Sequence, residues 1–491
     1  MSEHLGARAL LELICEDGSF TSWDEPFEPW PRSEAYEAEL AAARARSGVD
    51  ESVRSGEGLV GPHRVAFVAS EFAFLGGSIG RDAAARLIGA IERATRERLP
   101  LLAGPASGGT RLQEGTAAFV AMAGISAAIA RHKAAGLPYL VYLRHPTTGG
   151  VMSSWGSLGH VTVAEPGALL GFLGPRALEA LTGERLADGV QSAENLYAHG
   201  LVDAIVPPRT LPRIVHRALD VLMAPRPAAP TTPLESPRQA PVAAADAVAR
   251  SRDPRRPGLR ALLATAPTDV LTLNGTGRGE ADRGLLLALA KFGDAACVVI
   301  GHDRREGQPG RPFGPAALRQ LQRGVRLSSD LGLPLVSIID TPGAQLSREA
   351  EEGGLPGEIA RSLADLMQLA SPTVSVLLGP GTGGGALASL PADRVLCARN
   401  SWLAPLPPEG AAAILWRDPS RASEMADSLG MTATDLFAAG IVDAIIPEFD
   451  NAADEPIAFC RRTGAIIADA LGELAAMTYD ERLGRRVARY R

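Results

Sequence analysis

Cysteine is scarce in this sequence of 491 residues, and the four that occur are widely scattered. They are Cys15, Cys297, Cys397 and Cys460. No Cys-x-x-Cys pair is present, which argues against a zinc ribbon. Four separated thiols also make a poor disulfide framework for a chain this long. We therefore expect neither a structural zinc site nor a disulfide scaffold.

Long apolar runs and a strong charge of one sign are missing as well. The net charge of −7 gives no reason to expect a nucleic-acid partner. No run of 18 apolar residues suggests a membrane span. Residues 1–4 lack the basic start and apolar stretch of a signal peptide. We expect a cytoplasmic protein, and the 46% apolar and 21% charged residues are those of a soluble globular chain.

Glycine, by contrast, is abundant, and it is concentrated in two short stretches that each follow an apolar, strand-like segment. Strand-like residues 139–143 run into a first glycine corner, residues 146–151, and residues 374–378 run into a second, residues 379–386. Glycine allows the backbone angles that point successive N–H groups at one spot. Such a turn can hold an oxyanion without a charged side chain. Taken alone, either corner could simply be a tight strand-to-helix turn.

The spacing around the two corners repeats. Ser107 precedes Thr147 by 40 positions, and Thr341 precedes Thr382 by 41. Each half also closes on a Gly-x-Val-Asp-Ala-Ile signature, at 200–205 and 440–445. The sequence therefore predicts an internal duplication with a period of roughly 240 residues, far longer than solenoid repeats.

Length and composition then divide the chain. A chain of this size exceeds a usual single core, so we expect two domains of the α/β class. Prolines crowd together from 225 to 241 and indicate a linker. We expect a packing arm at 1–50, a first domain at 51–223, a Pro/Ala-rich linker at 224–257 and a second domain at 258–491.

Several long motifs resemble the carboxyltransferase component of biotin-dependent acetyl-CoA/acyl-CoA carboxylases. The first half is similar to the bacterial β subunit at Phe74-Leu75-Gly76-Gly77-Ser78, at 106–115 (ASGGTRLQEG), at the first glycine corner and at 164–169 (AEPGAL). The second half is similar to the α subunit at 339–344 (IDTPGA), at 383–387 (GGGAL) and at 408–416 (PEGAAAILW). The resemblance covers about residues 50 to 450. It implies a crotonase-like ββα superhelix, present twice in tandem.

The resemblance also implies a reaction. Carboxybiotin, delivered on a carrier protein, gives its carboxyl group to the α-carbon of a coenzyme A thioester, and acetyl-CoA becomes malonyl-CoA for fatty acid biosynthesis. Negative charge develops on the thioester oxygen of the enolate and on the ureido oxygen of biotin. Backbone N–H groups in a dry site stabilise both charges. The biotin nitrogen can itself serve as the base, which suits a sequence without a recognisable Ser–His–Asp group or metal cluster.

The resemblance assigns residues to these roles. Gly149 and Gly150 would face the thioester oxygen, and Gly384 and Gly385 the ureido oxygen. Arg111 and Arg176 could meet the phosphates of coenzyme A, with a surface or ion-paired arginine as the alternative for each. Further substrate-binding positions are Gly108, Gly109, Gly343, Ala344 and Ala386.

Other polar residues at matching positions are interpreted as structural. Glu114 and Glu165 are expected to cap a helix or order a loop. His145, beside the first corner, is expected to be structural or solvent-facing. Asp203 and Asp443, in the repeated closing signature, are expected to be structural. The four-cysteine zinc ribbon that the bacterial β subunit usually carries is missing, so no zinc is expected.

The chain lacks a Met-Lys-Met biotinylation site and a Gly-rich ATP-binding domain. It should therefore need a biotin carboxylase and a biotin carboxyl carrier protein as partners. Family members place the active site between protomers, so a homo-oligomer, dimer or larger, is expected. Two alternatives remain open. One is a malonyl-thioester decarboxylase of the same superfamily, and the other is a non-catalytic scaffold paralogue in a carboxylase complex.

Overall fold

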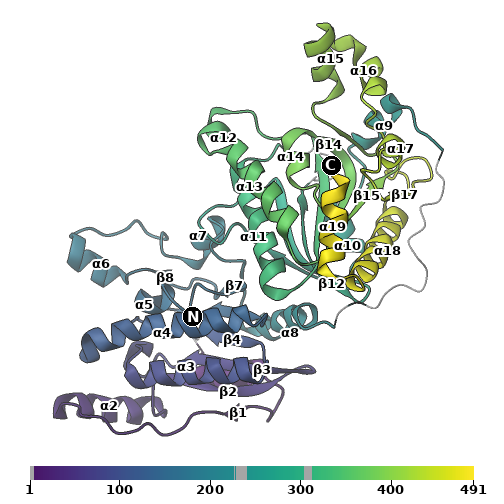
Figure 1. Ribbon diagram of the computed structural model, residues 1–491. Coiled ribbons are helices and arrows are strands. Elements are labelled where there is room, and N and C mark those ends of the chain that lie inside the picture. Colours follow the sequence, from purple (N-terminus) through teal and green to yellow (C-terminus); the bar gives the residue numbers. More distant parts are fainter. Residues whose placement is uncertain (1–4, 226, 228–239, 304–311) are drawn as a thin grey trace. The chain divides into compact units, whose positions relative to one another are not determined.

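The computed structural model describes residues 5–225, 227, 240–303 and 312–491. The chain divides into two compact units (Figure 1). The first unit is Met1–Asp220 with Gly277–Gly279, and the second is Val221–Thr276 with Glu280–Arg491.

A seven-stranded sheet forms the centre of the first unit, in the order β1-β2-β3-β4-β5-β7-β9. β1 to β3 pair antiparallel, and the strands from β3 onward pair parallel. β4 and β5 are buried along their whole length, as expected of parallel strands covered on both faces. The strands are β1 (Thr21–Ser22), β2 (Val53–Val60), β3 (His63–Ser70), β4 (Leu101–Gly104), β5 (Tyr139–Leu143), β7 (Val161–Ala164) and β9 (Ala204–Ile205).

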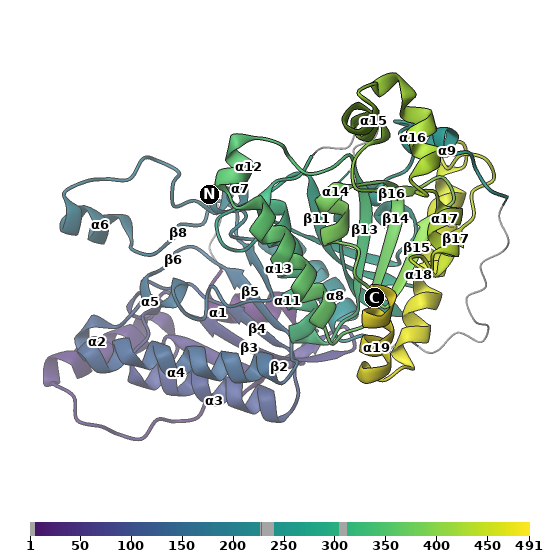
Figure 2. The same cartoon turned by 45° about the horizontal axis from the view of Figure 1, so that its top comes forward.

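Helices cover this sheet, and a small parallel pair lies off it. α3 and α4 lie side by side over one face (Figures 1 and 2), and their buried aliphatic side chains share one core with the central strands. The pair off the sheet is β6 (Thr147–Thr148) with β8 (Leu170–Gly171). The helices are α1 (Ala7–Ile14), α2 (Glu34–Ser47), α3 (Arg81–Arg96), α4 (Gly115–Ala134), α5 (Gly149–Met152), α6 (Pro175–Thr182), α7 (Ala193–Ala198) and α8 (Leu211–Leu222).

The sheet of the second unit repeats the first. Its main path is β10-β11-β12-β13-β14-β15-β17, again antiparallel up to the third strand and parallel thereafter. β16 (Trp402–Ala404) pairs with the end of β14. The path strands are β10 (Asp269–Leu273), β11 (Leu285–Phe292), β12 (Ala295–His302), β13 (Leu335–Thr341), β14 (Thr373–Thr382), β15 (Arg394–Ala398) and β17 (Ala444–Ile446). The predicted duplication is therefore confirmed.

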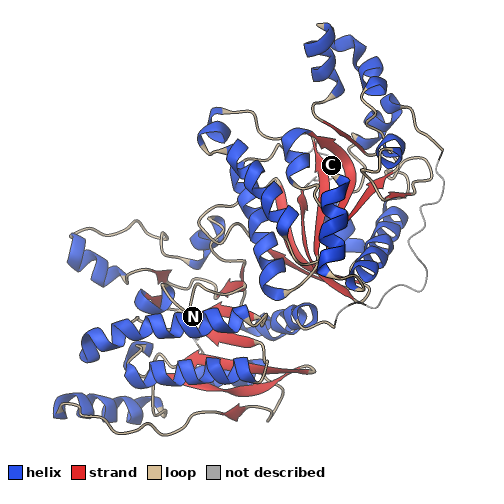
Figure 3. Cartoon of the chain, in the orientation of Figure 1, coloured by secondary structure: helices blue, strands red, loops and turns tan. Residues whose placement is uncertain are grey.

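The helices of the second unit pack around this sheet (Figure 3). α10 and α18 bury their apolar faces against β11 to β14 in the largest core of the unit. The helices are α9 (Ala244–Ser251), α10 (Leu259–Thr265), α11 (Pro315–Leu331), α12 (Arg348–Glu352), α13 (Leu355–Gln368), α14 (Gly383–Ala388), α15 (Pro408–Trp416), α16 (Ala422–Ser428), α17 (Ala433–Ala438), α18 (Pro456–Ala475) and α19 (Tyr479–Arg489).

Part of the expected linker is folded. Ala244 and Ala247 of α9 are buried, and Ala244 lies in a small core with Trp402. The clustered prolines end at 241, and α9 begins three residues later. The average composition of residues 224–257 therefore predicted a linker where its last part forms a short amphipathic helix. The middle of the expected linker, 228–239, lies outside the described residues.

α4 is only partly buried, although its sequence is rich in alanine. Among the residues that the structure describes, the stretch Leu112–Ala134 is the one helix long and apolar enough to cross a membrane by length and composition, yet only 28% of its most apolar window is buried. Met122, Ile125 and Ile129 face the core, whereas Phe119 and Val120 are 64% and 59% exposed. One face of α4 is therefore apolar and open in this unit.

Candidate active site

The first glycine corner is a turn that only glycine fits. Gly149 begins α5 with a φ of 63°, in the left-handed region that side chains disfavour. A Cβ there would lie 3.1 Å from both the carbonyl oxygen of Gly108 and the Cα of Gly109. The Gly149 N–H donates to the carbonyl oxygen of Phe172 at 2.9 Å. The role of Gly149 is therefore the turn itself, since its donor is already used.

Gly150 supplies the donor that Gly149 does not. It is the second residue of α5, where a helix has no internal acceptor for the N–H. Within the described part of the chain, no carbonyl or side-chain oxygen accepts this N–H. Thr110 Oγ1 and Met122 Cγ would lie 2.9 and 3.4 Å from a Cβ at this position. The corner thus presents one backbone N–H in a tight, glycine-only setting.

Gly108 and Gly109 shape this corner from a neighbouring loop. Gly108 N–H donates to the carbonyl oxygen of Gly76 at 2.9 Å, and Gly109 N–H donates to Ser107 Oγ at 3.0 Å. A Cβ on Gly109, whose φ is 110°, would lie 3.2 Å from the nitrogen of Gly150. Both glycines therefore permit close backbone contact, and both of their N–H groups are already engaged.

The second glycine corner has the same construction. Gly383 begins α14 with a φ of 66°. Gly384 and Gly385 follow as the second and third helical residues, and no described atom accepts either N–H. A Cβ on Gly385 would lie 2.0 Å from the tip of the Phe313 ring, and one on Gly384 would lie 3.0 Å from Ile359 Cδ1. These two N–H groups are the counterparts of the one at Gly150.

The loop beside the second corner repeats the hydroxyl bond and the parallel bridge of the Ser107 loop. Gly343 has a φ of 128°, and its N–H donates to Thr341 Oγ1 at 3.1 Å. Ala344 pairs with Phe313 in a parallel bridge, just as Thr110 pairs with Ile79. Ala386, by contrast, is fully buried in the core of α14. It therefore supports the corner from within.

The two predicted phosphate-binding arginines differ in their surroundings. Arg111 is only 1% exposed, and its guanidinium donates to Glu51, Ser52 and the carbonyl oxygen of Ser78. No donor of this guanidinium is left for a solvent-borne phosphate, so the ion-paired alternative describes it. Arg176 is exposed at the start of α6 and lines a pocket of about 450 Å³ with Arg185.

The other polar residues hold loops together, as expected. Glu165 accepts the His145 N–H at 2.9 Å, and His145 Nδ1 accepts the Leu169 N–H at 3.0 Å. Asp203 Oδ2 accepts the Thr162 N–H at 2.9 Å, and Asp443 Oδ2 accepts that of Val395 at 2.7 Å. Glu114 accepts the first N–H of α3, from Arg81, at 2.5 Å. The closing signature thus ties the end of each half to its sheet.

Sequence reasoning missed two buried arginines that brace the strands before the corners. Arg144 donates to the carbonyl oxygens of Ser70 and Gly104, at the ends of β3 and β4, and burial lowers its pKa to about 10. Arg256 pairs with Glu448 at 2.6 Å and donates to the carbonyl oxygen of Leu378 at 3.0 Å. Arg144 lies two residues before the first corner, so its position in the sequence could have indicated a role there. Arg256 lies in an arginine-rich run, residues 252–260, whose composition alone favours the surface.

Metal ligands do not gather in the described part of the chain. Among the residues that the structure describes, no group of three or more His, Cys, Asp or Glu side chains could hold a metal ion.

Comparison with known proteins gives consistent matches. Residues 236–491 match the family described as acetyl co-enzyme A carboxylase carboxyltransferase-like. A probable biotin-dependent acyl-coenzyme A carboxylase beta3 subunit of Mycobacterium tuberculosis is 55% identical over 484 residues, which are 98% of this chain and 97% of that protein. The acetyl-coenzyme A carboxylase carboxyl transferase subunits beta/alpha of Salinispora arenicola are 37% identical over 488 residues, covering 94% of this chain and 86% of theirs.

Solved structures share the fold. A crystal structure of transcarboxylase 12S, described as a hexamer with methylmalonyl-coenzyme A bound, superposes with a TM-score of 0.76 at 22% identity, over 96% of this chain and 90% of that one. That fold is the crotonase-like domain in tandem, which agrees with the repeated sheets. The repeated corners, the shared fold and the close relatives lead to one conclusion: this chain belongs to the carboxyltransferases of biotin-dependent acyl-CoA carboxylases.

Proposed function

We propose that this protein transfers the carboxyl group from carboxybiotin, held on a carrier protein, to acetyl-CoA, giving malonyl-CoA. The observation that carries the proposal is the presence of two similar corners, each with backbone N–H groups that no atom of the described residues accepts. One donor comes from Gly150, and two come from Gly384 and Gly385. The reaction develops negative charge on two oxygens, and two oxyanion sites match that need.

The first unit takes the acyl-CoA in this proposal. The thioester oxygen accepts the Gly150 N–H, which favours the enolate because the fixed donor does not have to reorganise as charge develops. Thr110 and Met122 flank this point. Arg176, exposed in its pocket, receives a phosphate of coenzyme A in place of the buried Arg111.

The second unit takes the biotin. Gly384 and Gly385 leave a corner whose walls a Cβ would fill, so a ureido oxygen can approach both N–H groups closely. When bound, biotin supplies the carboxyl group and a nitrogen base. The chain contributes the two donors and, through Arg256 and Leu378, the brace that holds the strand before them.

Acetyl-CoA is the proposed acyl substrate because Ala386 and Leu387 follow the second corner, as in the acetyl-CoA type. The Salinispora relative carries the name of an acetyl-CoA carboxylase, while the mycobacterial relative is named only for acyl-CoA. Malonyl-CoA formation would place the protein at the start of fatty acid biosynthesis.

The proposed partners are a biotin carboxylase, a biotin carboxyl carrier protein and further copies of this chain. Exposed apolar side chains support the oligomer, since patches of this kind mark contact surfaces. In the first unit they lie on α4, at Phe119 and Val120, and in the second unit they lie on α15, at Ile414 and Leu415.

The forward reaction tests this proposal. The purified protein is mixed with a purified biotin carboxylase and its biotinylated carrier, with ATP, bicarbonate and either acetyl-CoA or propionyl-CoA. We expect malonyl-CoA to form faster than methylmalonyl-CoA, and only when all three proteins are present. If the carrier is demonstrably carboxylated and neither product appears, the proposed transfer is wrong. Faster formation of methylmalonyl-CoA would keep the transfer and overturn the choice of acetyl-CoA.

A further inference from the structure

Three backbone segments stack against one another beside Gly150, with no side chain between them. The middle segment is 106–111, and the outer ones are 75–79 and 147–150. A Cβ on Gly77 would lie 2.0 Å from the carbonyl oxygen of Ala106, and one on Gly149 would lie 3.1 Å from that of Gly108. Closely packed protein atoms transmit displacements to their neighbours. A small shift of the middle segment therefore reaches the Gly149–Gly150 peptide directly.

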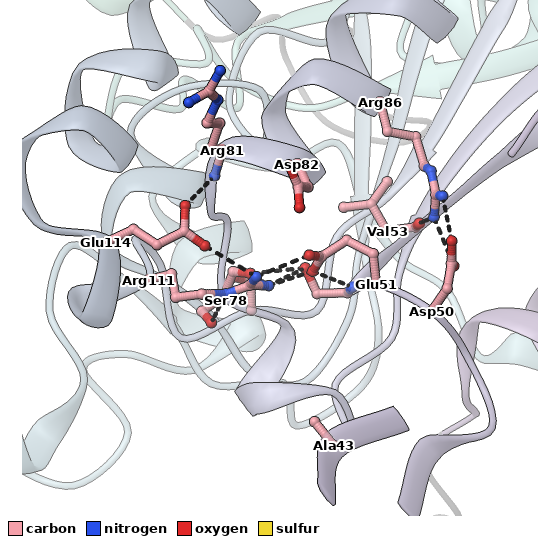
Figure 4. Close-up of polar contacts among 12 residues, drawn as sticks. Ala43, Asp50, Glu51, Val53, Ser78, Arg81, Asp82, Arg86, Arg111 and Glu114 are labelled. Atoms are coloured by element: carbon pink, nitrogen blue, oxygen red, sulfur yellow. Dashed lines mark hydrogen bonds and ion pairs between the residues drawn. The ribbon is translucent and has the colours of Figure 1, made fainter. Parts of the chain in front are cut away.

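Arg111 anchors the far end of this middle segment (Figure 4). Its guanidinium donates to both oxygens of Glu51, at 2.9 Å to Oε2, and to the carbonyl oxygen of Ser78 at 2.7 Å. Arg111 and Glu51 are 1% and 2% exposed. The planar guanidinium fixes direction as well as distance, because two parallel hydrogen bonds to one carboxylate allow a single orientation.

A second layer holds this pair in place. Tyr36, on α2, donates its hydroxyl to Glu114, and the same hydroxyl accepts from Arg111 at 3.3 Å. Glu114 also accepts the N–H of Arg81 at 2.5 Å, which ties the segment to the start of α3. The end of the 106–111 segment is thereby joined to α2 and to the start of α3 through polar contacts.

We propose that the buried Arg111–Glu51 pair is a positioning element of the carboxyl-transfer site, one that sets the 106–111 segment against Gly149 and so aims the Gly150 N–H at the thioester oxygen. This inference rests on the proposed function of the first corner. It gives Arg111 a role in the reaction without contact to coenzyme A.

The chain offers a matched control for the test. Arg86 is also buried, at 7% exposure, and also forms a bidentate pair, with Asp50 at 2.6 and 2.9 Å. It donates to the carbonyl oxygen of Val53 at 2.9 Å, and among the described residues it forms no hydrogen bond with the 106–111 segment. Arg86→Lys therefore damages a comparable ion pair of the same unit, at Asp50 beside Glu51, and removes none of the hydrogen bonds that Arg111 makes.

The experiment compares Arg111→Lys with Arg86→Lys. Both substitutions keep the positive charge and remove the planar guanidinium that makes two parallel hydrogen bonds to one carboxylate. Transfer of carboxyl from malonyl-CoA to biocytin is followed. We expect Arg111→Lys to lower kcat roughly tenfold to a hundredfold while KM for malonyl-CoA changes by less than about twofold, because a small misplacement affects the transition state most. Arg86→Lys is expected to keep kcat within about twofold. Tyr36→Phe, which removes one contact of the second layer, is expected to fall between them.

Amide hydrogen exchange provides a readout that does not depend on activity. We expect Arg111→Lys, and not Arg86→Lys, to speed exchange at residues 147–151. Equal kcat for the two variants, or a change confined to KM, would overturn the positioning role. If the wild-type protein transfers no carboxyl group, the proposed function fails. The exchange comparison then decides alone: faster exchange at 147–151 in Arg111→Lys supports the positioning of the corner, and equal exchange in both variants overturns it.

Discussion

Gly150 is the residue on which the proposed chemistry depends most. Gly150 contributes its main-chain N–H, which no substitution by a non-proline residue removes. An added side chain can, however, displace this N–H. Thr110 and Met122 leave little room for a Cβ, which would lie 2.9 Å from Thr110 Oγ1. Substitution must therefore move the corner or its neighbours.

We predict that Gly150→Ala lowers kcat for carboxyl transfer by about a hundredfold, the loss typical of a disturbed oxyanion donor. Steady-state kinetics with malonyl-CoA and biocytin measure it. Gly89→Ala is the control, because Gly89 lies in helix α3 with no atom within 4 Å of the added Cβ. That variant should keep kcat and gain up to about 1 kcal/mol in stability. An unchanged kcat in Gly150→Ala would contradict the role of this corner.

Residue chemistry also shows where sequence reasoning stopped. Residue identity alone suggested that Arg111 could meet a phosphate, since arginine suits phosphate. Whether an arginine is free or already paired depends on partners far along the chain, and Glu51 lies 60 positions away. The same holds for Gly149, whose N–H turned out to be used by Phe172. The motif located the corner, while the choice of donor required the coordinates.

At the scale of elements, α14 and the segment before α11 meet at one unusually close contact. The tip of the Phe313 ring lies where a Cβ on Gly385 would be, 2.0 Å away. Phe313 is 1% exposed and packs against His302 in a tilted arrangement, with ring centroids 4.9 Å apart, so the ring cannot move aside freely. The position of α14 therefore depends on this ring.

We predict that Gly385→Ala and Phe313→Leu interact strongly. Gly385→Ala alone should destabilise the protein by about 1 to 3 kcal/mol, the range for overpacking, and should lower transfer activity. Adding Phe313→Leu removes the ring tip, so the double variant should be more stable than the sum of the two changes predicts. Denaturant unfolding of the four proteins measures the coupling. Additive losses would show that the contact is not responsible.

α4 has a buried face toward α3 and an open apolar face. We predict that Val120→Asp lowers the oligomeric state in analytical ultracentrifugation, because a charge would have to be buried in the contact. The unfolding free energy of the dissociated chain should change little, since Val120 is 59% exposed. Ala130→Asp, at an exposed position two to three turns further along α4, is the control and should leave assembly intact. A wild-type protein that sediments as an active monomer would contradict the proposed oligomer.

Two of the buried histidines, one in each unit, predict a pH dependence of stability for the whole molecule. Burial lowers the pKa of His132, in the first unit, and of His302, in the second, from 6.5 to about 4. Below pH 6.5 these two histidines bind protons in the unfolded chain, whereas in the folded chain they stay neutral until the pH approaches 4. The stabilisation is therefore complete above pH 6.5 and is lost as the pH falls toward 4.

We predict that each histidine costs about 2 kcal/mol of unfolding free energy between pH 7.5 and pH 5, at about 1.4 kcal/mol per pH unit below 6.5. Urea unfolding at the two pH values measures the loss. His132→Gln should reduce it by removing one titrating group. If the loss in that variant equals that of the wild type, His132 is not responsible for it.

The sequence was most informative at the scale of the whole molecule, because the spacing of the repeated motifs predicts the duplication. The loops that precede the two corners by 40 and 41 positions have the same construction. In each, a glycine N–H donates to a hydroxyl two residues earlier, and that glycine, Gly109 or Gly343, has a positive φ. The strand order was not predicted, but it is the same in both units, which agrees with the duplication. The folded helix α9 was not predicted, because its buried face consists of small residues next to a proline-rich stretch.

The central claim is that one protein moves a carboxyl group between two carriers at two glycine corners. The most direct measurement gives the purified protein malonyl-CoA with and without biocytin and follows acetyl-CoA. The account predicts that acetyl-CoA forms and that its release depends on biocytin, with saturation in both substrates. Release at the same rate without biocytin would contradict it and would identify a malonyl-thioester decarboxylase. No release from folded, assembled protein would contradict it as well and would favour a non-catalytic scaffold.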